Sequence, residues 1–316
     1  MSANAAIQNI LVIKHGALGD VILAQSPFQA IRDHHPAAHI TLLTTSMFEP
    51  FLKNANLFDD IWIDEKPKLW QLLKISALKS RLRKGKFDRV YDLQTSSRSS
   101  SYLKLFSSSH MPEWSGTAKA CSHPHKNEQR GKLHTIERQA EQLRDAGIDR
   151  IPDADFKWSV GDITQFGLPA KFALLVPGGA AHRPEKRWPS GYYAELAIRL
   201  ASTAITPVLL GGSAEADVIA DIMKKCPRAI DLSGKTSLTD LAGLGASAVF
   251  AVGNDTGPLH MIAAVGCPVT VLFSAASDPA RARPRGADVT VLREEDLAKL
   301  SVGAVLETLK MAKSDD

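Results

Sequence analysis

The run Val252-Gly253-Asn254-Asp255-Thr256-Gly257-Pro258-Leu259-His260 predicts a turn from a strand into a helix. The apolar strand 248–252 precedes this turn, and an apolar helical stretch, 259–265, follows it. Proline suits the first turn of a helix, where its missing N–H is not needed. The amides around Thr256 and Gly257 are then donors at a helix N-terminus, which favours phosphate. An ordinary turn capped by Asp255 or Thr256 is the structural alternative.

Strand and helix patterns alternate along the chain of 316 residues. The expected strands are 10–13, 39–45, 60–63, 87–93, 172–176, 205–210, 248–252, 268–273 and 288–292, and the expected helices are 20–34, 67–84, 132–146, 191–201, 214–225, 259–265 and 297–313. Such alternation is typical of parallel sheets with helices on both faces. The length favours two doubly wound α/β domains, with 151–169 as the expected linker. Ligands of such sheets bind at the carboxyl ends of the strands.

Composition and charge narrow the class of protein. No apolar run reaches the ~20 residues that span a bilayer, and residues 1–8 lack the pattern of a signal peptide. The three cysteines lie far apart, which fits a reducing cytosol and argues against a zinc site. Residues 1–160 contain 22 Lys and Arg against 17 Asp and Glu, whereas residues 161–316 contain 16 against 17. The first half is therefore the better candidate for an acidic partner, without any nucleic-acid-binding motif.

The first strand-to-helix turn reads Lys14-His15-Gly16-Ala17-Leu18-Gly19-Asp20. It contains G-x-x-G instead of the full G-x-G-x-x-G, so it supports a dinucleotide site only weakly. Asp20 has two interpretations. It could cap the following helix, or it could be a general base, since a helix N-terminus favours the ionised carboxylate that a base requires.

Two segments of the second half also end strands. The loop 177–189 is basic, and its Lys186 or Arg187 could neutralise a departing phosphate. Its structural alternative is a solvated loop anchored by Trp188. Glu215 follows Gly211-Gly212 and could accept hydrogen bonds from a ribose diol, or it could only stabilise the dipole of its helix.

Three further patterns are weaker. The cluster Arg281, Arg283 and Arg285 could clamp phosphate, although a solvated loop explains it equally well. The D-x-D sequence at 153–155 lies in the expected linker and not at a strand end, so no metal is assigned to it. The ten histidines show no metal-ligand spacing.

Taken together, these segments resemble glycosyltransferase family 9, the ADP-heptose:lipopolysaccharide heptosyltransferases. The match follows the expected order over most of the chain. The segments that carry it are Gly16-Ala17-Leu18-Gly19-Asp20 with Pro27, Tyr91-Asp92-Leu93-Gln94 with Arg98, Pro177-Gly178 with Lys186-Arg187-Trp188-Pro189, Gly211-Gly212 with Glu215, Gly253-Asn254-Asp255-Thr256-Gly257-Pro258 with His260, and Leu272-Phe273 with Asp278-Pro279. Lys14 stands where the family often has Arg, and 274–277 lacks the glycine and proline often found there.

The resemblance implies a GT-B fold, with two Rossmann-like domains that face each other across a cleft. Residues 1–165 would bind the acceptor and residues 166–316 the nucleotide sugar, with a final helix that can pack back on the first domain. The implied residues fall into three groups by role: Asp20 as catalytic base with Lys186 as its catalytic partner on the donor phosphates; Gly178, Lys186, Glu215, Asp255, Thr256, Gly257 and His260 for the nucleotide sugar; and Lys14, Gly19 and Arg98 for the acceptor.

The implied reaction is an inverting, metal-independent transfer of heptose from ADP-heptose to the lipopolysaccharide inner core, with no cofactor. The partners would be an ADP-sugar donor and an anionic glycolipid at the membrane surface. The expected location is the cytoplasm, with peripheral attachment to the inner face of the cytoplasmic membrane as a further option. Three alternatives stay open: the same fold with another sugar donor or acceptor, a nicotinamide-dependent oxidoreductase, and a non-catalytic nucleotide-binding protein.

Overall fold

The computed structural model describes residues 7–179 and 183–311, so 312–313 of the expected final helix lie outside the described residues. The chain divides into two compact units, Met1–Asp155 and Phe156–Asp316. Most of the segment expected as a linker, 151–169, belongs to the second unit because its backbone is bound there. Gly161, for example, donates its N–H to the carbonyl oxygen of Thr239 at 3.0 Å.

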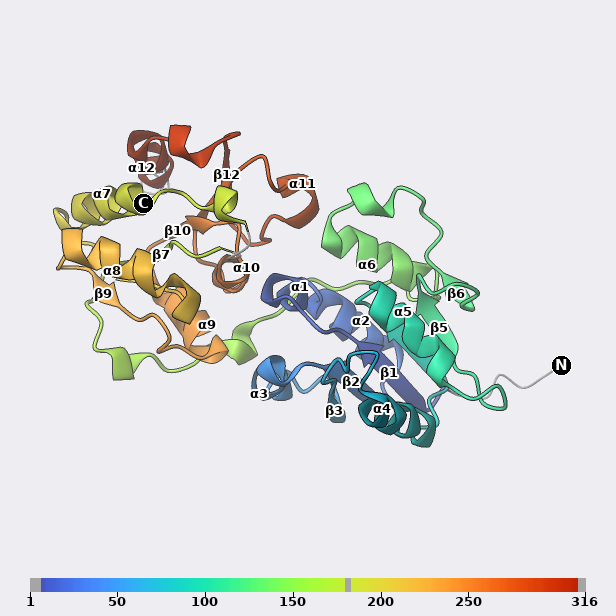
Figure 1. Cartoon of the computed structure of the whole chain (residues 1–316). Coiled ribbons are helices and arrows are strands. Elements are labelled where there is room, and N and C mark those ends of the chain that lie inside the picture. The colour runs from blue at the N-terminus through green and yellow to red at the C-terminus, as the bar shows by residue number, and fades with distance from the viewer. Residues whose placement is uncertain (1–6, 180–182, 312–316) are drawn as a thin grey trace. The chain divides into compact units, whose positions relative to one another are not determined.

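The first unit contains, within its described residues, one parallel six-stranded sheet in the order β3-β2-β1-β4-β5-β6 (Figure 1). Its strands are β1 (Asn9–Ile13), β2 (His39–Thr44), β3 (Asp60–Ile63), β4 (Arg89–Asp92), β5 (Glu113–Gly116) and β6 (His123–Pro124). Its helices are α1 (Leu18–Ile22), α2 (Gln25–His34), α3 (Glu49–Lys53), α4 (Leu72–Lys84), α5 (Ser97–Ser101) and α6 (Thr135–Arg144). Leu82 of α4 packs with Leu11, Val90 and Trp114 of the sheet in one buried cluster.

The second unit repeats this plan in its own described residues, with the parallel order β12-β11-β10-β7-β8-β9. Its strands are β7 (Phe172–Val176), β8 (Thr206–Leu209), β9 (Ile230–Asp231), β10 (Ala251–Asn254), β11 (Val269–Phe273) and β12 (Val289–Arg293). Its helices are α7 (Ser190–Ala201), α8 (Ala216–Lys225), α9 (Leu238–Ser247), α10 (Gly257–Ala264), α11 (Pro279–Ala282) and α12 (Val302–Met311). Residues of α7, α8 and α12 share one core with the sheet, and the final helix packs on α7 and β11.

Both sheets have the same strand order when each unit is counted from its own first strand. Successive strands are therefore added on one side of β1 and then, from β4 on, on its other side, and the same change occurs between β7 and β10 in the second unit. Ligands of doubly wound sheets bind at this switch point, outside the carboxyl ends of the strands. The order thus points to the ends of these four strands as the places for functional groups.

The predicted α/β fold is confirmed, with local differences. The helix expected at 20–34 is two helices separated by a turn at Leu23 and Ala24, and α4 begins at Leu72, after a turn in which Lys68 donates its N–H to the Gln71 side chain at 2.8 Å. Helix α9 and the short strands β5, β6 and β9 were not predicted. None of the helices in the described part of the chain is long and apolar enough to cross a membrane.

Candidate active site

Lys14 directly follows β1 at the switch point of the first unit, and its side chain is buried. Its Nζ donates to the carbonyl oxygen of Leu93, the residue after β4, at 3.2 Å. Burial lowers the pKa of Lys14 to about 8, although the negative charges of Asp20 and Asp92 oppose this shift. A cation is therefore held inside the protein at the ends of two central strands, with two carboxylates close enough to act on it.

Asp20 lies in the first turn of α1 and is half-buried. Ala17 occupies the N-cap position of this helix, so the interpretation of Asp20 as the helix cap is wrong. Gly16 gives the turn before α1 its shape: its φ is +114°, and a Cβ there would lie 2.7 Å from Cε2 of Phe48. Only glycine fits both restraints. The turn thus places Asp20 beside the charge of Lys14, and the predicted acceptor-binding Gly19 is buried next to Asp20.

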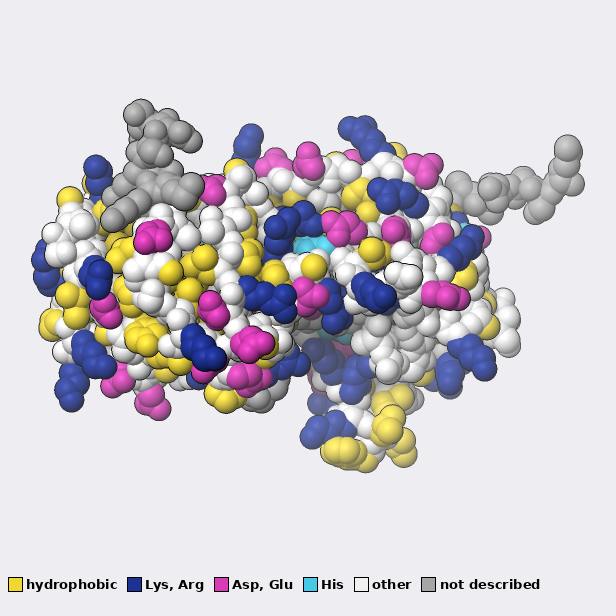
Figure 2. All heavy atoms as spheres, turned by 90° about the horizontal axis from the view of Figure 1, so that it is seen from above, with side chains coloured by type: hydrophobic (Ala, Val, Ile, Leu, Met, Phe, Trp, Pro, Cys, Tyr) yellow, Lys and Arg dark blue, Asp and Glu magenta, His cyan; other side chains and the backbone are white. Residues whose placement is uncertain are grey.

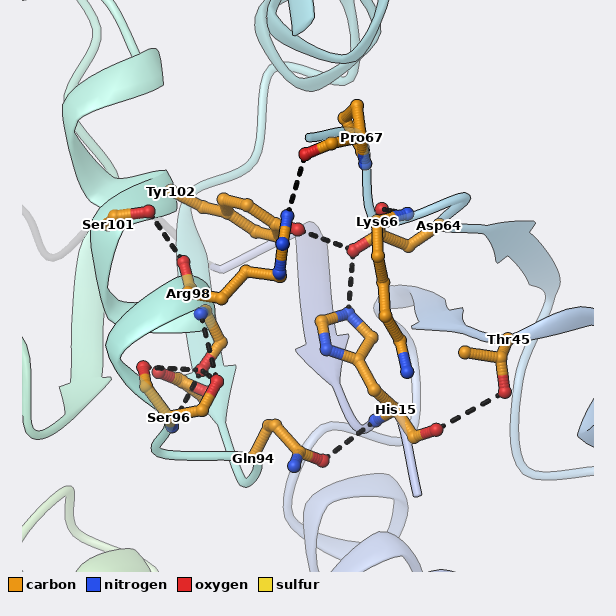
Figure 3. A network of polar contacts seen from close by, with 12 residues as sticks. His15, Thr45, Asp64, Lys66, Pro67, Gln94, Ser96, Arg98, Ser101 and Tyr102 are labelled. Atoms are coloured by element: carbon orange, nitrogen blue, oxygen red, sulfur yellow. Dashed lines mark hydrogen bonds and ion pairs between the residues drawn. The ribbon is translucent and has the colours of Figure 1, made fainter. Parts of the chain in front are cut away.

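His15 begins a buried polar network that holds this turn (Figure 3). Its Nε2 lies 2.9 Å from Oδ2 of Asp64, which also accepts the hydroxyl hydrogen of Tyr102 at 2.6 Å. Burial alone would raise the pKa of the Asp64 carboxyl, but the hydrogen bonds from His15 and Tyr102 outweigh it and lower that pKa. Gln94, two residues after β4, adds a further hydrogen bond, since its side-chain oxygen accepts the backbone N–H of His15 at 2.9 Å. The first strand-to-helix turn is thereby fixed by side chains from two other loops.

Arg98, predicted to bind the acceptor, belongs to the same network. It lies in α5, and its guanidinium donates to the carbonyl oxygen of Pro67 at 2.9 Å (Figure 3). Ser96 and Ser99 form a capping box that fixes the start of α5. The structure therefore brings Arg98 to the segment after β3, and through Tyr102 and Asp64 to His15, the neighbour of Lys14.

Two arginines that follow the last strand of this sheet, Arg130 and Arg138, were not assigned to the site from the sequence. Arg130 donates to Nδ1 of His125 at 3.0 Å and to the hydroxyl of Thr95 at 3.3 Å. Burial lowers its pKa, the charge of Arg138 adds to this effect, and Asp92 opposes it. Arg138 also acts on Lys14. Lys14 and Arg130 therefore both interact with the charge of the buried Asp92, and Arg138 acts on both of these cations. The signal that could have found the two arginines is the position of 130–138 directly after the last strand of the sheet.

Asn254 organises the switch point of the second unit. It is fully buried, and its Oδ1 accepts the N–H of Trp188 at 2.9 Å and the hydroxyl of Tyr193 at 3.1 Å. Its Nδ2 donates to the carbonyl oxygens of Pro177 and Gly178, both at 2.9 Å. One side chain thus joins the end of β10, the turn after β7 and the loop before α7. Trp188 is buried and donates its indole N–H to the Leu300 carbonyl at 2.9 Å, as expected for an anchor.

Lys186 and Asp255 are brought together although 69 residues separate them. The Lys186 Nζ lies 2.7 Å from Oδ2 of Asp255, and both side chains are about nine-tenths buried. Helix α10 starts two residues after Asp255. Thr256 is at its N-cap position with extended backbone, Pro258 is in its first turn, and among the described residues no side chain caps its first amides. His260, one turn into α10, is buried. A lysine ammonium and a helix N-terminus therefore lie at one strand end.

Glu215 sits against the turn after β7. A Cβ on Gly178 would lie 3.0 Å from Cγ of Glu215, so a larger residue would push the Glu215 side chain aside. One carboxylate oxygen accepts the N–H of Gly212 at 2.8 Å, which is the structural role expected as an alternative. The other lies 3.9 Å from the guanidinium of Arg187. Glu215 therefore caps its own turn and also faces the loop that carries Lys186.

The remaining sequence patterns lie mostly at the surface of their units. Arg281 and Arg283 are exposed, and Arg285 is half-buried. Asp153 and Asp155 are exposed at the end of the first unit. In the described ranges no three His, Cys, Asp or Glu side chains are grouped in a way that would hold a metal ion.

Two doubly wound parallel sheets, one in each unit, are the architecture of the GT-B fold. The sequence pattern of glycosyltransferase family 9 (heptosyltransferase) matches residues 75–308, which is most of the chain. The chain therefore belongs to this family and is a glycosyltransferase.

Individual relatives agree with this assignment. The lipopolysaccharide heptosyltransferase 2 of Escherichia coli strain K12 is 25% identical over 304 residues, which cover 85% of this chain and 83% of that protein. The lipooligosaccharide heptosyltransferase 2 of Haemophilus influenzae is 33% identical over 132 residues, which cover 40% of this chain and only 38% of that protein. The solved structure of E. coli ADP-heptose lps heptosyltransferase II has a TM-score of 0.79 at 23% identity and covers 96% of this chain and 98% of that one. This last likeness supports the fold alone.

Proposed function

We propose that this glycosyltransferase moves a heptose from ADP-heptose to an inner-core lipopolysaccharide acceptor, with inversion at the anomeric carbon and without a metal ion. The single observation that carries the donor side is the Lys186–Asp255 pair, 2.7 Å apart, beside the N-terminus of α10. The names of the E. coli and H. influenzae relatives support the choice of heptose and of this class of acceptor.

On the donor side, the diphosphate leaves with growing negative charge as the sugar departs. The ammonium of Lys186 and the amides after Thr256 would stabilise this charge, which is the task a metal ion performs in other transferases. The Asp255 carboxylate would hold Lys186 in place and would also border the sugar. Gly178 and Glu215 would bind the ribose, since the glycine leaves room for the carboxylate. His260 would border the sugar and diphosphate from inside α10.

On the acceptor side, Asp20 would act as general base. It would take the proton from the acceptor hydroxyl as its oxygen attacks the anomeric carbon from the face opposite the diphosphate. Lys14, with Gly19 beside Asp20 and Arg98 in the neighbouring network, would receive an anionic acceptor. The cations Arg130 and Arg138, which act on each other or on Lys14, support an acceptor that carries carboxylates or phosphates.

The base is tested with Asp20→Asn, and Asp33→Asn in α2 serves as the matched control. We expect Asp20→Asn to slow sugar transfer from ADP-heptose to the acceptor, measured as the rate of ADP formation, by about 10²–10⁴-fold. A positioned general base contributes a rate factor of this size. ADP affinity, measured by calorimetry, should stay unchanged in both variants. An Asp20→Asn variant that still transfers at the wild-type rate, or that loses ADP affinity equally, would show that Asp20 is not the base.

The donor side is tested with Lys186→Ala and with a panel of ADP, UDP and GDP sugars. Lys186→Ala should weaken ADP binding as well as transfer, and only the ADP-heptose donor should support turnover by the wild-type protein. Transfer should survive dialysis against EDTA. Loss of activity in EDTA that Mg²⁺ restores would contradict the metal-independent mechanism, and turnover with a UDP or GDP sugar alone would contradict the choice of donor.

A further inference from the structure

Four large hydrophobic side chains stand exposed at the start of α4. Leu69 is 87% exposed, Trp70 74%, Leu72 72% and Leu73 87%. Figure 2 shows hydrophobic side chains gathered with lysine or arginine side chains at the edge of the molecule where α4 lies in Figure 1. Single exposed apolar residues are ordinary, but a contiguous group marks a surface that contacts something.

These four residues do not belong to the face by which α4 packs on its sheet. That face consists of Ile75, Leu78 and Leu82, spaced as one side of a helix, and Leu82 is completely buried. The core of the first unit is therefore satisfied without Leu69, Trp70, Leu72 and Leu73. We call these four residues the apolar patch.

Positive charge surrounds the apolar patch. The segment 65–84 contains seven Lys and Arg residues and a single acidic residue, Glu65. Lys68 places its Nζ 4.9 Å from the centre of the Trp70 ring, and Lys74 pairs with Glu65 at 2.5 Å. An aromatic ring and leucines within a basic segment are the composition of elements that lie in the interface of an anionic bilayer, where tryptophan prefers the headgroup level.

The apolar patch is tied to the candidate acceptor site. It follows directly on Asp64 and Pro67, which accept hydrogen bonds from Tyr102 and Arg98 (Figure 3). Asp64 also binds His15, in the turn that leads to Asp20. A surface that binds this segment would therefore hold the carboxyl ends of the β1 and β3 strands close to it.

We infer that the apolar patch and its basic neighbours dock the first unit on an anionic lipid bilayer. This inference rests on the proposed function for the identity of the acceptor, and it deepens that function. An acceptor anchored in a bilayer can be reached only by an enzyme that approaches the bilayer surface. Hydrophobic insertion of the apolar patch would supply one part of the affinity, and attraction between the lysines and arginines and the anionic headgroups would supply the other.

The test is flotation of the full chain with vesicles of phosphatidylglycerol and phosphatidylethanolamine, and with vesicles of phosphatidylcholine alone. The wild type should bind the anionic vesicles, and less so at high salt. Binding should fall about tenfold or more in Leu69→Ser/Trp70→Ser and in Lys68→Glu/Lys79→Glu. The matched controls Ile198→Ser and Lys224→Glu/Lys225→Glu, which change exposed side chains of the second unit, should bind as the wild type does.

Two outcomes would overturn the docking surface: a wild type that ignores anionic vesicles, or apolar-patch variants that bind them normally. If the wild type is a dimer in analytical ultracentrifugation and Leu69→Ser/Trp70→Ser separates it without changing vesicle binding, the apolar patch joins two copies of the chain instead. Transfer to a water-soluble acceptor fragment separates this inference from the proposed function. The variants should keep that transfer, and its absence in a wild type that binds vesicles would refute the function and leave the docking surface standing.

Discussion

Asn254→Ala should damage the stability of the second unit and its affinity for ADP together. Asn254 is fully buried and makes four hydrogen bonds, to the backbone of Pro177, Gly178 and Trp188 and to the hydroxyl of Tyr193. A net contribution of about 0.5–1.5 kcal/mol for each bond gives a loss of about 2–6 kcal/mol in the free energy of unfolding. The upper half of this range applies if the buried groups left behind find no water.

The effect on ADP follows from what these bonds hold. Trp188 ends the loop that carries Lys186, and Asn254 itself precedes Asp255. When the Trp188 N–H loses its acceptor, the Lys186 ammonium loses its fixed position at the start of α10. We expect ADP affinity to fall about tenfold, which corresponds to about 1.4 kcal/mol.

Tyr193→Phe is the matched control. It removes a single hydroxyl, which lies 3.1 Å from Oδ1 of Asn254 and 3.2 Å from the carbonyl oxygen of Val176, and it leaves the Trp188 bond intact. The expected loss in stability is about 1–2 kcal/mol with unchanged ADP affinity.

The assay is urea unfolding followed by tryptophan fluorescence, with and without ADP, and calorimetry for the affinity. The unfolding transition that shifts to higher urea concentration in the presence of ADP belongs to the second unit, because a ligand stabilises the part of the protein that binds it. Two results would refute the reasoning: an Asn254→Ala variant no less stable than Tyr193→Phe, or one that binds ADP as tightly as the wild type.

Two further predictions concern the charged pairs. Asp255→Asn removes the carboxylate that holds Lys186, so ADP should bind several-fold more weakly in calorimetry and sugar transfer should fall; ADP binding as tight as in the wild type would contradict the holding role. For Lys14, the folded-state pKa of about 8 lies below the ordinary lysine value of 10.5, so the unfolded chain binds more protons between these pH values and stability should rise with pH there, by up to about 3 kcal/mol. Lys14→Met should lack this rise in urea unfolding at pH 7.5 and 10, and parallel curves for both proteins would exclude a buried charged Lys14.

Local signals at strand ends predicted some of the turns and helix starts on which the candidate site is built. Pro258 after Thr256 indicated a helix start, and α10 begins at Gly257. Lys186 and Asp255 were each predicted as donor ligands, but their ion pair was not. A pairing between positions 69 residues apart depends on the strand order β7-β10, which a single sequence does not contain. Asn254 was not predicted as a site residue for the same reason, since each of its four bonds goes to a residue at least 61 positions away in the sequence.

The elements that were missed show where tertiary contacts override local preference. Helix α9 contains Gly243 and Gly245, which weaken an isolated helix. Gly243 is nevertheless needed, because a Cβ there would lie 2.3 Å from the carbonyl oxygen of Gly161. Strand β6 has two residues, too few for any period to be visible. Helix α9 packs against Gly161 and strand β6 pairs with β5, and neither contact can be predicted from the residues of the element itself.

The two switch points differ in the surroundings of their lysines. Lys14 is buried beside a backbone carbonyl, and its charge depends on Asp20 and Asp92, which act at longer range and only partly offset the loss of solvation. Lys186 has a carboxylate at 2.7 Å and keeps some exposure. Burial brings the pKa of Lys14 close to neutral pH, whereas Lys186 lies beside a helix N-terminus where an anion can approach it. This difference fits a proposed division of labour in which the first unit handles a proton and the second a diphosphate.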